Sequence, residues 1–544
     1  MNIKISILGG GISGLSVAHN LSIKGFKDIT IYEKNANTGG MARSNRLMKN
    51  ELDKRPFNYS WRVLGKGYYN LRAILRKILT KGGTVEDLFV DMSKHWVIIN
   101  NEIVKMDTSI STILKFYGHL KSFCFDDFLK ISNAYLYSVT ACDERIDTHD
   151  NETWSSFIGS LSQDARMMMV DSCGPIFGVD YHKVNATSIL TTLNTVSAFI
   201  PGHNQILSTT WDTGVFQPWE DALKKRGVKI RLKTSVDKID VKDDEIEGFI
   251  ADGERIKSDI YFICLPVEQA HNLLKQSRLE RSLSLLRING KQLMTNLTVY
   301  FEERIYMKGE GTGIYLPQSP WKLIIQPCGE VWKENIYRKY GVGDIWFIGI
   351  CCSECLGILH EKSFSNCSIE EATSEVLCQI RSYGLDKHLT TSSGKKFSEV
   401  EILETKMWET FYDDALNRIS TTEPKFSTNV NTLKYSPIPR CPEISNAYFA
   451  TAYCKTSRRT FLMDNCAEAA GIACNAFFDD LNSDVERVKI YETKPRFSIL
   501  KPLRALDRVL FTNNISHIRK ICHPLVILLI YFYILGYIFV WIIL

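Results

Sequence analysis

The chain lacks the cysteine pattern of a disulfide-rich secreted domain and of a zinc-binding module. Its 15 cysteines are spread over 544 residues without a recognisable framework. Cys352 and Cys355 form a C-x-x-C pair, with no second pair at zinc-finger spacing, and a single pair in an apolar strand more often packs than binds metal or reacts. We therefore predict no metal site and cysteines that are mostly reduced, as in the cytosol.

A large excess of one charge is also missing. The 66 lysines and arginines nearly balance the 61 aspartates and glutamates, which leaves a net charge of +5. This value is modest for the chain length and argues against a nucleic-acid-binding enzyme. We expect no N-terminal signal peptide, because the first apolar residues run into glycines rather than a cleavage site. At 45% apolar content the chain can bury the cores of two or more domains.

The last residues lack charged side chains altogether. Residues 521–544 contain no Asp, Glu, Lys or Arg, and a helix that begins at Pro524 and rises ~1.5 Å per residue would cross the ~30 Å hydrocarbon core. Basic side chains precede it: Lys494, Arg496, Lys501, Arg504, Arg508, Arg519 and Lys520. The positive-inside rule then predicts a basic juxtamembrane segment over 488–521, a single transmembrane helix over 522–544, and a globular part that faces the cytosol. A buried C-terminal core helix is the less favoured alternative.

The chain begins with a strand pattern that runs into a glycine-rich turn. Residues 3–8 are largely apolar, and Gly9, Gly11 and Gly14 follow in a G-x-G-x-x-G motif that also contains Ser13. In such a motif the first glycine permits a tight turn, the second lets the backbone approach a pyrophosphate, and the third lets the next helix pack on the strand. The N-terminus of that helix favours phosphate. The motif predicts a dinucleotide site.

An acidic residue stands where such a site requires one. Residues 29–32 read as a second strand, and Glu33 follows it, roughly 20 residues beyond the glycines, where a carboxylate binds the ribose hydroxyls. The same charge disfavours a ribose that carries a 2′-phosphate. The alternative, a chance glycine turn in another α/β unit, is disfavoured because strand, helix, second strand and acid all follow in order.

The next residues resemble a flavoprotein family. Residues 39–44 read Gly-Gly-Met-Ala-Arg-Ser and resemble the G-G-x-x-R-S segment of the flavin-containing amine oxidoreductases, which include monoamine oxidases, carotenoid desaturases and protoporphyrinogen oxidases. The resemblance implies FAD as cofactor. Gly40 permits a second close backbone approach, and Arg43 can supply a charge-assisted hydrogen bond to the anionic cofactor.

Two later segments are similar to the same family. Val236 lies in a segment that corresponds to the part of the family's flavin domain whose backbone contacts the adenine. Met463 and Asp464 begin a stretch that resembles the helix whose N-terminus points at the flavin ring, where its dipole stabilises negative charge. Thr451 and Ala452 stand where the family usually has Gly followed by an acid.

The resemblance implies an α/β fold, with a Rossmann-like FAD-binding domain assembled from split segments and an α+β substrate domain. The apolar tail adds the C-terminal transmembrane helix. We assign the FAD-binding domain to residues 1–60, 206–289 and 431–487, and the substrate domain to residues 61–205 and 290–430. From apolar spacing we expect the first substrate segment to be largely helical, for example over 69–79. The second has strand-like runs at 297–301 and 345–350.

The family removes a hydride from C–N or C–C bonds, which leaves three hypotheses. The first is an FAD-dependent oxidoreductase, tail-anchored in a membrane, that acts on a lipophilic small molecule. The second is an amine oxidase that releases hydrogen peroxide. The third is a non-redox flavin isomerase or mutase, or a degenerate scaffold at the membrane. The lysine that monoamine oxidases place near the flavin aligns near Asn296, and Tyr453 and Phe461 are candidate aromatics beside the flavin. No residue is assigned as catalytic, because hydride transfer to flavin needs little acid–base help.

Overall fold

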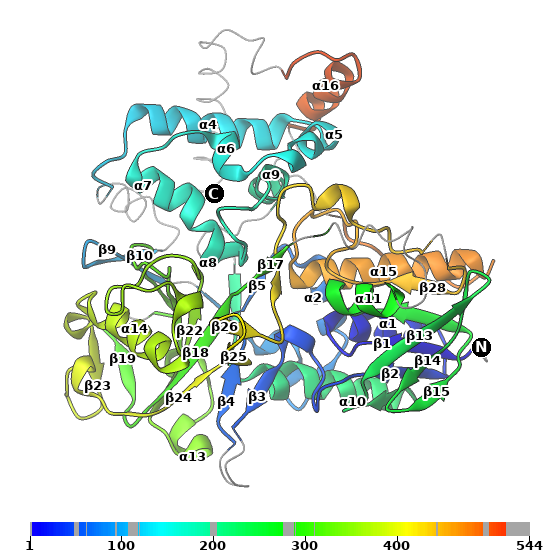
Figure 1. The fold of residues 1–544 in the computed structure, drawn as a ribbon, viewed down its shortest axis with the longest axis horizontal. Helices are drawn as coiled ribbons and strands as arrows, with labels where there is room; N and C mark the ends of the chain where they lie inside the picture. The colour runs from blue at the N-terminus through cyan, green and yellow to red at the C-terminus, as the bar shows by residue number, and fades with distance from the viewer. Residues whose placement is uncertain are drawn as a thin grey trace.

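We describe a computed structural model of the chain, shown in Figure 1. The structure describes residues 3–47, 54–60, 62–92, 95–106, 118, 120–195, 204–275, 288, 290–308, 311–441, 444–482, 484–492 and 500–517. Figure 1 shows a parallel sheet with its helices at the right, a larger mixed sheet at the lower left, and a helical subdomain at the top.

The five-stranded sheet at the right of Figure 1 is parallel throughout. In spatial order its strands are β12 (Lys229–Arg231), β2 (Ile29–Tyr32), β1 (Ile5–Leu8), β16 (Ile260–Ile263) and β28 (Ala447–Phe449). Counted along the chain, the strands lie in the order third, second, first, fourth, fifth, which is the Rossmann order. The predicted α/β Rossmann-like fold is therefore confirmed.

Helices cover one face of this sheet, and a helix with a small sheet covers the other. Side chains of β1 alternate between the two cores, because successive residues of a strand point to opposite faces. The first face packs against α1 (Ile12–Ile23), α2 (Tyr69–Leu75), α10 (Gln217–Lys225) and α15 (Met463–Asp480). The second packs against α11 (Val267–Lys275) and the sheet of β13 (Val236–Lys242), β14 (Glu245–Ala251) and β15 (Glu254–Ile256).

A seven-stranded sheet forms the centre of the second part. Its order is β10 (Glu102–Met106), β9 (His95–Ile99), β20 (Ile314–Tyr315), β21 (Ile324–Pro327), β22 (Asp344–Ile350), β18 (Thr295–Phe301) and β24 (Ile402–Met407). Only the β9–β20 pairing is parallel among these neighbours. Helix α14 (Ile369–Arg381) packs on the same apolar core. The strands predicted at 297–301 and 345–350 are confirmed in β18 and β22.

The prediction that residues 61–205 are largely helical is wrong for their first third. After α2 the chain forms short strands, and β9 and β10 extend the seven-stranded sheet. The run Trp96-Val97-Ile98-Ile99 is buried and rich in β-branched side chains, which favour a strand once a neighbouring strand edge is available.

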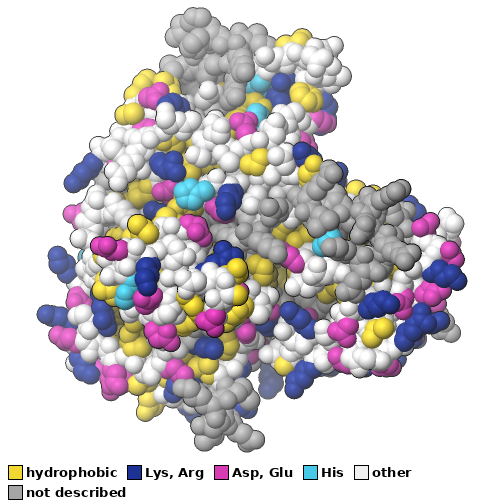
Figure 2. Space-filling model, viewed as in Figure 1, with side chains coloured by type: hydrophobic (Ala, Val, Ile, Leu, Met, Phe, Trp, Pro, Cys, Tyr) yellow, Lys and Arg dark blue, Asp and Glu magenta, His cyan; other side chains and the backbone are white. Residues whose placement is uncertain are grey.

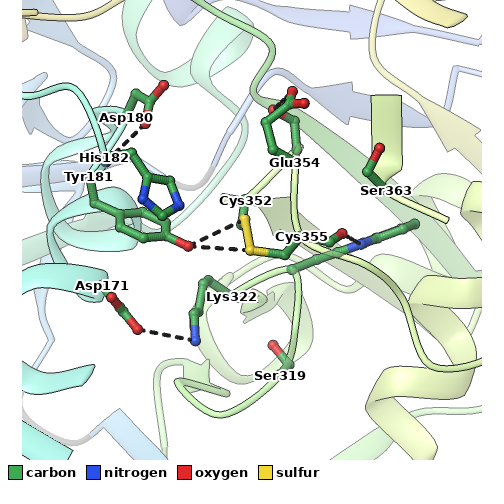
Figure 3. The surroundings of a disulfide bond; sticks show 12 residues. Asp171, Asp180, Tyr181, His182, Ser319, Lys322, Cys352, Glu354, Cys355 and Ser363 are labelled. Atoms are coloured by element: carbon green, nitrogen blue, oxygen red, sulfur yellow. Dashed lines mark hydrogen bonds and ion pairs between the residues drawn. A yellow bond between two sulfur atoms is a disulfide. The ribbon is translucent and has the colours of Figure 1, made fainter. Parts of the chain in front are cut away.

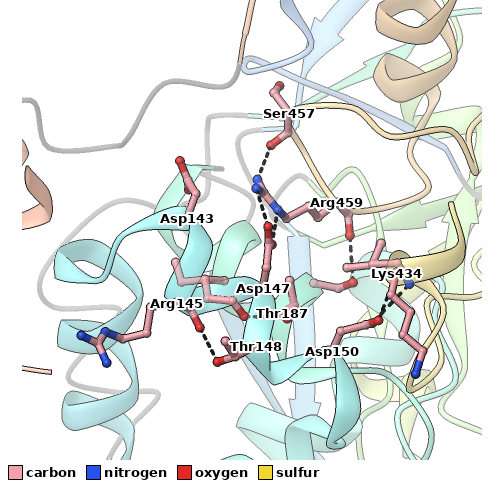
Figure 4. Close-up of polar contacts among 12 residues, drawn as sticks. Asp143, Arg145, Asp147, Thr148, Asp150, Thr187, Lys434, Ser457 and Arg459 are labelled. Carbon is pink, nitrogen blue, oxygen red and sulfur yellow. Dashed lines mark hydrogen bonds and ion pairs between the residues drawn. The ribbon is translucent and has the colours of Figure 1, made fainter. Parts of the chain in front are cut away.

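The helical subdomain comprises residues 125–195. Its helices are α4 (Phe125–Thr140), α5 (Asp143–Asp147), α6 (Trp154–Ile158), α7 (Gln163–Arg166), α8 (Cys173–Phe177) and α9 (Ala186–Thr195). Figure 4 shows how it is joined to the loop before α15: Arg459 Nη2 donates to Asp147 Oδ2 at 3.0 Å, and Asp150 Oδ2 accepts from the backbone N–H of Lys434 at 3.1 Å. Helix α16 (Lys501–Thr512) packs against α4 and α5.

The remaining elements are short. They are α12 (Cys328–Val331), α13 (Ile336–Tyr340), β3 (Ser44–Arg46), β4 (Pro56–Asn58), β5 (Val63–Gly65), β6 (Leu79–Thr80), β7 (Gly83–Thr84), β8 (Phe89–Asp91), β11 (Asn204–Leu207), β17 (Lys291–Gln292), β19 (Ile305–Met307), β23 (Leu389–Thr391), β25 (Thr410–Asp413), β26 (Arg418–Thr421) and β27 (Lys425–Phe426). Of these, β27 matters most for the site, because it pairs with β17 close to the five-stranded sheet's aromatic residues.

On the face shown in Figure 2, basic and acidic side chains are interspersed over the described surface. This distribution agrees with the small net charge. Within the part of the chain that the structure describes, no helix is both long and apolar enough to span a bilayer. The transmembrane helix predicted over 522–544 lies outside the described residues, as do residues 493–499 and 518–521 of the juxtamembrane segment.

Candidate cofactor site

Two glycines of the N-terminal motif, Gly9 and Gly14, are required because a side chain at either position would collide with other atoms of the protein. Gly9 has φ +104°, and a Cβ there would lie 2.7 Å from the carbonyl oxygen of Cys264. A Cβ on Gly14 would lie 2.0 Å from the carbonyl oxygen of Gly9. These contacts explain the tight turn after β1 and the close packing of α1 on it.

Gly11 differs, because the protein around it has room for a side chain. The nearest atom to a Cβ at Gly11 is the Cα of Gly40, at 3.8 Å. Helix α1 begins directly after Gly11 without a side-chain cap and without an acidic residue in its first turn. The N–H groups of that turn can therefore bind a phosphate. A side chain at Gly11 would occupy the space in front of them, so the local geometry fits a pyrophosphate.

A second glycine turn lies against the first. Gly39, with φ +109°, donates its N–H to the carbonyl oxygen of Gly10 at 2.8 Å. A Cβ on Gly40 would approach the Cα of Gly11 to 3.2 Å. Ser13, in the first turn of α1, lies beside Cys466 of α15. The structure thus brings the G-x-G-x-x-G turn and the Gly39-Gly40 turn together.

Glu33 lies at the carboxyl end of β2, and hydrogen bonds within the protein hold its carboxylate in place. Its Oε2 accepts the N–H of Gly10 at 2.8 Å, and its Oε1 accepts the N–H and Nδ2 of Asn35 at 2.9 and 2.8 Å. The carboxylate is therefore held at the glycine turn and retains lone pairs for ribose hydroxyls. The Glu33 carbonyl accepts the N–H of Thr234 at 2.9 Å, which places Val236, the first residue of β13, at the same end of the site.

Arg43 makes internal contacts in this structure. Its Nη1 donates to the carbonyl oxygen of Gly40 at 2.9 Å, its Nη2 lies 3.0 Å from Glu423 Oε1, and its guanidinium lies 5.0 Å from the ring centroid of Trp408. These contacts fix Arg43 beside the Gly39-Gly40 turn. Its predicted bond to the cofactor stays a prediction.

Arg62 is a site residue that sequence reasoning missed. It is buried, and it donates to the carbonyl oxygens of Ala42 at 2.7 Å and of Arg43 at 3.1 Å. Burial, followed by the positive charge of Arg43, lowers the pKa of Arg62 to about 9. Two carboxylates act on this pair of arginines: Glu423 forms an ion pair with Arg43, and the negative charge of Asp212 acts on Arg62. Nothing in the spacing of Arg62 from the glycines signals its role.

Several buried polar atoms around the two arginines have no hydrogen-bond partner among the described residues. They are Tyr59 Oη, Arg62 Nε, Trp408 Nε1 and Glu423 Oε2. Tyr59 and Trp408 are in edge contact, with ring centroids 6.1 Å apart. Buried polar groups in native proteins are normally paired, so this cluster fits a polar ligand that supplies the missing partners.

Lys425 brings an amine into the same region. It lies on β27, half-buried against Gly178 and close to Cys351, and burial lowers the pKa of its ammonium to about 8. No carboxylate of the described residues forms an ion pair with it. The next residue, Phe426, contacts the ring of Phe461 with centroids 4.1 Å apart. Lys425 and Phe426 thus link the large-sheet part to the loop before α15.

Asn296, which stands where monoamine oxidases place their lysine, lies inside the seven-stranded sheet. Asn296 is buried in β18, and its carbonyl oxygen accepts the N–H of Trp408 at 3.0 Å. Lys425 is the lysine that the tertiary structure places among the site residues. Tyr453 is buried and donates to the carbonyl oxygen of Leu265 at 3.2 Å, which anchors it beneath Phe426.

At the start of α15, Asp464 makes contacts within the protein, and the predicted contact of this helix end with a flavin stays a prediction. Asp464 is fully buried; its Oδ1 accepts the N–H of Leu71 at 2.8 Å and its Oδ2 lies 3.0 Å from Arg458 Nε. Its carboxylate therefore joins α15 to α2. Met463, the first residue of the helix, packs at the edge of the core shared by α1 and α15. Thr451 is buried, with its Oγ1 3.3 Å from the sulfur of Cys454.

Comparison with known proteins supports the fold. Residues 7–78 match the family described as an NAD(P)-binding Rossmann-like domain, and no curated protein matches in sequence. The structure is similar to an oxidoreductase from Methanosarcina mazei, with TM-score 0.54 and 12% identity over 86% of this chain and 99% of that one.

Two further solved structures share this architecture. Cyclohexylamine oxidase from Brevibacterium oxydans has TM-score 0.51 and 11% identity, over 89% of this chain and 100% of that one. The CLA-producing fatty acid isomerase from P. acnes has TM-score 0.54 and 13% identity, over 86% and 97%. At such identities the likeness shows a common fold, and the activity has to be argued from the site.

Proposed function

We propose that this protein is an FAD-dependent oxidoreductase that oxidises a lipophilic small molecule at a membrane surface. The observation that carries the proposal is the pair of facing glycine turns at Gly11 and Gly40, beside which the buried arginines Arg43 and Arg62 lie. The two turns lie in contact, so both would approach the pyrophosphate, the group that joins the two halves of a dinucleotide. The similarity to an oxidoreductase and to cyclohexylamine oxidase supports the same class.

Each part of the cofactor has residues suited to hold it. The first turn of α1 with Gly11 would hold the pyrophosphate, Glu33 the ribose, and the backbone near Val236 the adenine. FAD would supply the hydride acceptor. Arg43 and Arg62 would stabilise the negative charge that a reduced flavin carries, because both are buried positive charges beside the glycine turns.

Lys425 is suited to take up a proton. Its Nζ has a pKa of about 8, so a substantial fraction is neutral at physiological pH and can accept a proton as the substrate loses a hydride. Phe426, Phe461 and Tyr453 would form an apolar wall beside it. An apolar wall with a single basic nitrogen suits a lipophilic substrate that carries one polar group.

The membrane part of the proposal rests on the tail and on α16. Helix α16 precedes the predicted anchor at 522–544, and Leu506 and Val509 are 45% and 58% exposed on its outer side. Asp507, between them, points inward to Arg145. A helix with an exposed apolar stripe and basic neighbours such as Arg508 is suited to lie in a bilayer interface.

The first test is an absorption spectrum of the full chain purified in detergent, with any released cofactor identified by chromatography. Flavin bands and released FAD are expected, and anaerobic bleaching of those bands by membrane lipid extracts would identify the substrate class. A folded, colourless protein that FAD does not reconstitute would overturn the proposal and favour a scaffold that has lost the cofactor.

Two specific observations favour other chemistries on the same site. Lys425 and the similarity to cyclohexylamine oxidase favour an amine oxidase, which would release hydrogen peroxide with amines. The similarity to a fatty acid isomerase favours a flavin isomerase, which would convert an unsaturated lipid without net flavin reduction. Peroxide release and product analysis under anaerobic conditions separate these from the main proposal.

A further inference from the structure

Cys352 and Cys355 form a disulfide in the structure, in contrast to the packing role that the sequence favours. Their Cα atoms are 6.0 Å apart, within the range that a disulfide requires. The pair follows β22 and lies where the seven-stranded sheet meets the helical subdomain, as Figure 3 shows. Cys352 belongs to the core of the helical subdomain, and Cys355 packs against both cores.

The two sulfurs have different access to solvent. Cys352 is 4% exposed, whereas Cys355 is half-buried and lies between the exposed residues Glu354 and Leu356. A thiolate from outside therefore reaches the sulfur of Cys355 first, and the sulfur of Cys352 becomes the leaving group.

The leaving sulfur has a hydrogen-bond donor next to it. The hydroxyl of Tyr181 donates to Cys352 Sγ at 3.4 Å and lies 3.3 Å from Cys355 Sγ, as drawn in Figure 3. Burial raises the pKa of Tyr181, so this hydroxyl keeps its proton at neutral pH. A phenol hydroxyl in this position stabilises the Cys352 thiolate as the disulfide opens.

Contacts that do not involve the sulfurs hold the loop in place. The carbonyl oxygen of Trp321 accepts the N–H groups of Cys351 and Cys352, each at 3.0 Å. The indole Nε1 of Trp321 donates to the carbonyl oxygen of Cys355 at 2.9 Å. These bonds can persist in the dithiol state and keep the two thiols adjacent, so that closure of the disulfide is rapid and reversible.

We propose that Cys352 and Cys355 are a thiol–disulfide exchange site that takes two electrons from cellular thiols such as glutathione and returns them, by the reverse exchange, to a disulfide such as oxidised glutathione. A reductant thiolate attacks Cys355 Sγ, the S–S bond breaks, and Cys352 leaves as a thiolate that takes up a proton. A second reductant thiol then displaces Cys355 from the mixed disulfide. The balance is one protein disulfide reduced to two thiols, and two reductant thiols oxidised to one disulfide.

The state of this pair is linked to the candidate cofactor site. Cys351, the preceding residue, is buried close to Lys425, and Tyr181 comes from the helical subdomain. Opening the disulfide removes a covalent restraint within the loop that lies at this junction, so we expect the reduced and oxidised forms to differ in turnover. This consequence rests on the proposed function, whereas the exchange reaction does not.

The test is differential alkylation of the full chain in detergent, followed by peptide mass spectrometry. The protein is equilibrated in buffers of increasing ratio of reduced to oxidised glutathione, or with a dithiol, and then trapped with iodoacetamide under denaturing conditions. We expect Cys352 and Cys355 to pass together from unmodified to fully alkylated in one transition, whereas Cys378, half-buried and without a disulfide, is alkylated throughout.

Variants identify the attacked sulfur. In Cys352→Ser we expect Cys355 to retain one glutathione as a stable mixed disulfide, and in Cys355→Ser we expect much less adduct at the buried Cys352. Full alkylation of both cysteines without any reductant would overturn the proposal, as would a pair that neither glutathione nor the dithiol opens. If the dithiol reduces the Cys352–Cys355 disulfide and glutathione does not, the exchange site is supported and its partner is a dithiol protein. None of these readouts depends on flavin or activity. A failure of the exchange proposal can therefore be told apart from a failure of the proposed function.

Discussion

At the scale of single residues, the glycines of the N-terminal motif serve different purposes. Gly9 and Gly14 are required by contacts within the protein, whereas a Cβ at Gly11 would have no neighbour closer than 3.8 Å. The motif thus combines residues needed for folding with one whose lack of a side chain matters to the ligand. A substitution at Gly9 or Gly14 should therefore impair folding, whereas a substitution at Gly11 should impair ligand binding.

Gly11→Val is expected to leave the protein folded and to abolish flavin binding, because the side chain would project toward the phosphate space. The measurement is flavin absorbance per protein together with the melting temperature. Gly82→Val is the matched control, since nothing lies within 4 Å of a Cβ there. Gly14→Val should fail to fold, owing to the 2.0 Å approach to the carbonyl oxygen of Gly9. Normal flavin content in Gly11→Val would contradict the assignment of the phosphate turn.

Lys425 predicts a pH dependence. Its pKa in the folded protein is lowered to about 8 from the usual 10.5, so the neutral amine forms as pH rises through 8. If it accepts the substrate proton, turnover should rise through that pH and level off, and Lys425→Met should be slow at every pH. If the pH profile of Lys425→Met keeps the same inflection, that inflection comes from another titrating group and the role of Lys425 is contradicted.

The same lysine affects stability in a defined direction. Between pH 8 and 10.5 the unfolded chain binds more protons at Lys425 than the folded one, so the free energy of unfolding should rise with pH across that window. Lys425→Met should remove this slope and stabilise the protein at pH 7 by roughly 1–2 kcal/mol, since a half-buried side chain keeps part of its solvation. Urea unfolding at pH 7 and pH 10 would measure both effects.

At the scale of elements, α16 is attached to the helical subdomain by one buried carboxylate. Asp507 is 1% exposed; it accepts the backbone N–H of Cys142 at 2.8 Å and lies 2.9 Å from Arg145 Nε. On the same helix Arg508 reaches Glu144 at the surface, where both side chains are about half exposed. Removal of the buried ion pair should therefore cost much more free energy of α16 docking than removal of the exposed one.

Asp507→Ala is expected to cost about 3–5 kcal/mol of the docking of α16, because it removes the carboxylate that pairs with Arg145 Nε and accepts the buried N–H of Cys142. Arg508→Ala should cost less than about 1 kcal/mol. Protease sensitivity of the 500–517 region, with the unfolding midpoint, would report both. Equal effects of the two substitutions would mean that α16 is held mainly by its apolar contacts.

At the scale of the whole molecule, the proposed membrane contact combines α16 with the tail. A chain that ends at His517 keeps α16 docked, since His517 is buried 3.2 Å from the hydroxyl of Thr140. Such a chain isolates the contribution of α16 from that of residues 522–544. The exposed apolar stripe of α16 is then the part of the surface to be tested.

In this shortened chain, Leu506→Ser with Val509→Ser is expected to reduce flotation with vesicles that contain anionic lipid by at least several-fold, because about 0.8 kcal/mol is lost per CH₂ group no longer buried in the interface. Leu416→Ser, at a comparably exposed leucine in the loop after β25, is the control. Unchanged flotation in the double variant would leave membrane attachment to the C-terminal tail alone.

The parts of the site that depend on local spacing could be predicted from the sequence. The strand, the glycine turn, α1 and Glu33 fall within the first 33 residues, and residues 297–301 and 345–350 form the expected strands. Their patterns reflect local sterics and alternating burial, which neighbours in the chain largely determine. The secondary structure of the short apolar run at residues 96–99 could not be decided from the sequence, because a buried strand and a buried helix share that composition.

Only the tertiary structure decided which distant residues meet. Arg43 and Glu423 are 380 positions apart in the chain, and the Arg62, Lys425 and Trp408 side chains join them through separate elements. Asp464 turns toward Arg458 and α2 because burial makes an unpaired carboxylate costly, and Cys352 and Cys355 become a disulfide because the turn after β22 brings their sulfurs together. Sequence determined the nucleotide turn because its geometry is local. The arginine pair and the position of Lys425 required the fold, because both depend on contacts between segments that sequence spacing does not relate. The disulfide required it because the conformation of the turn after β22 sets the distance between the two sulfurs.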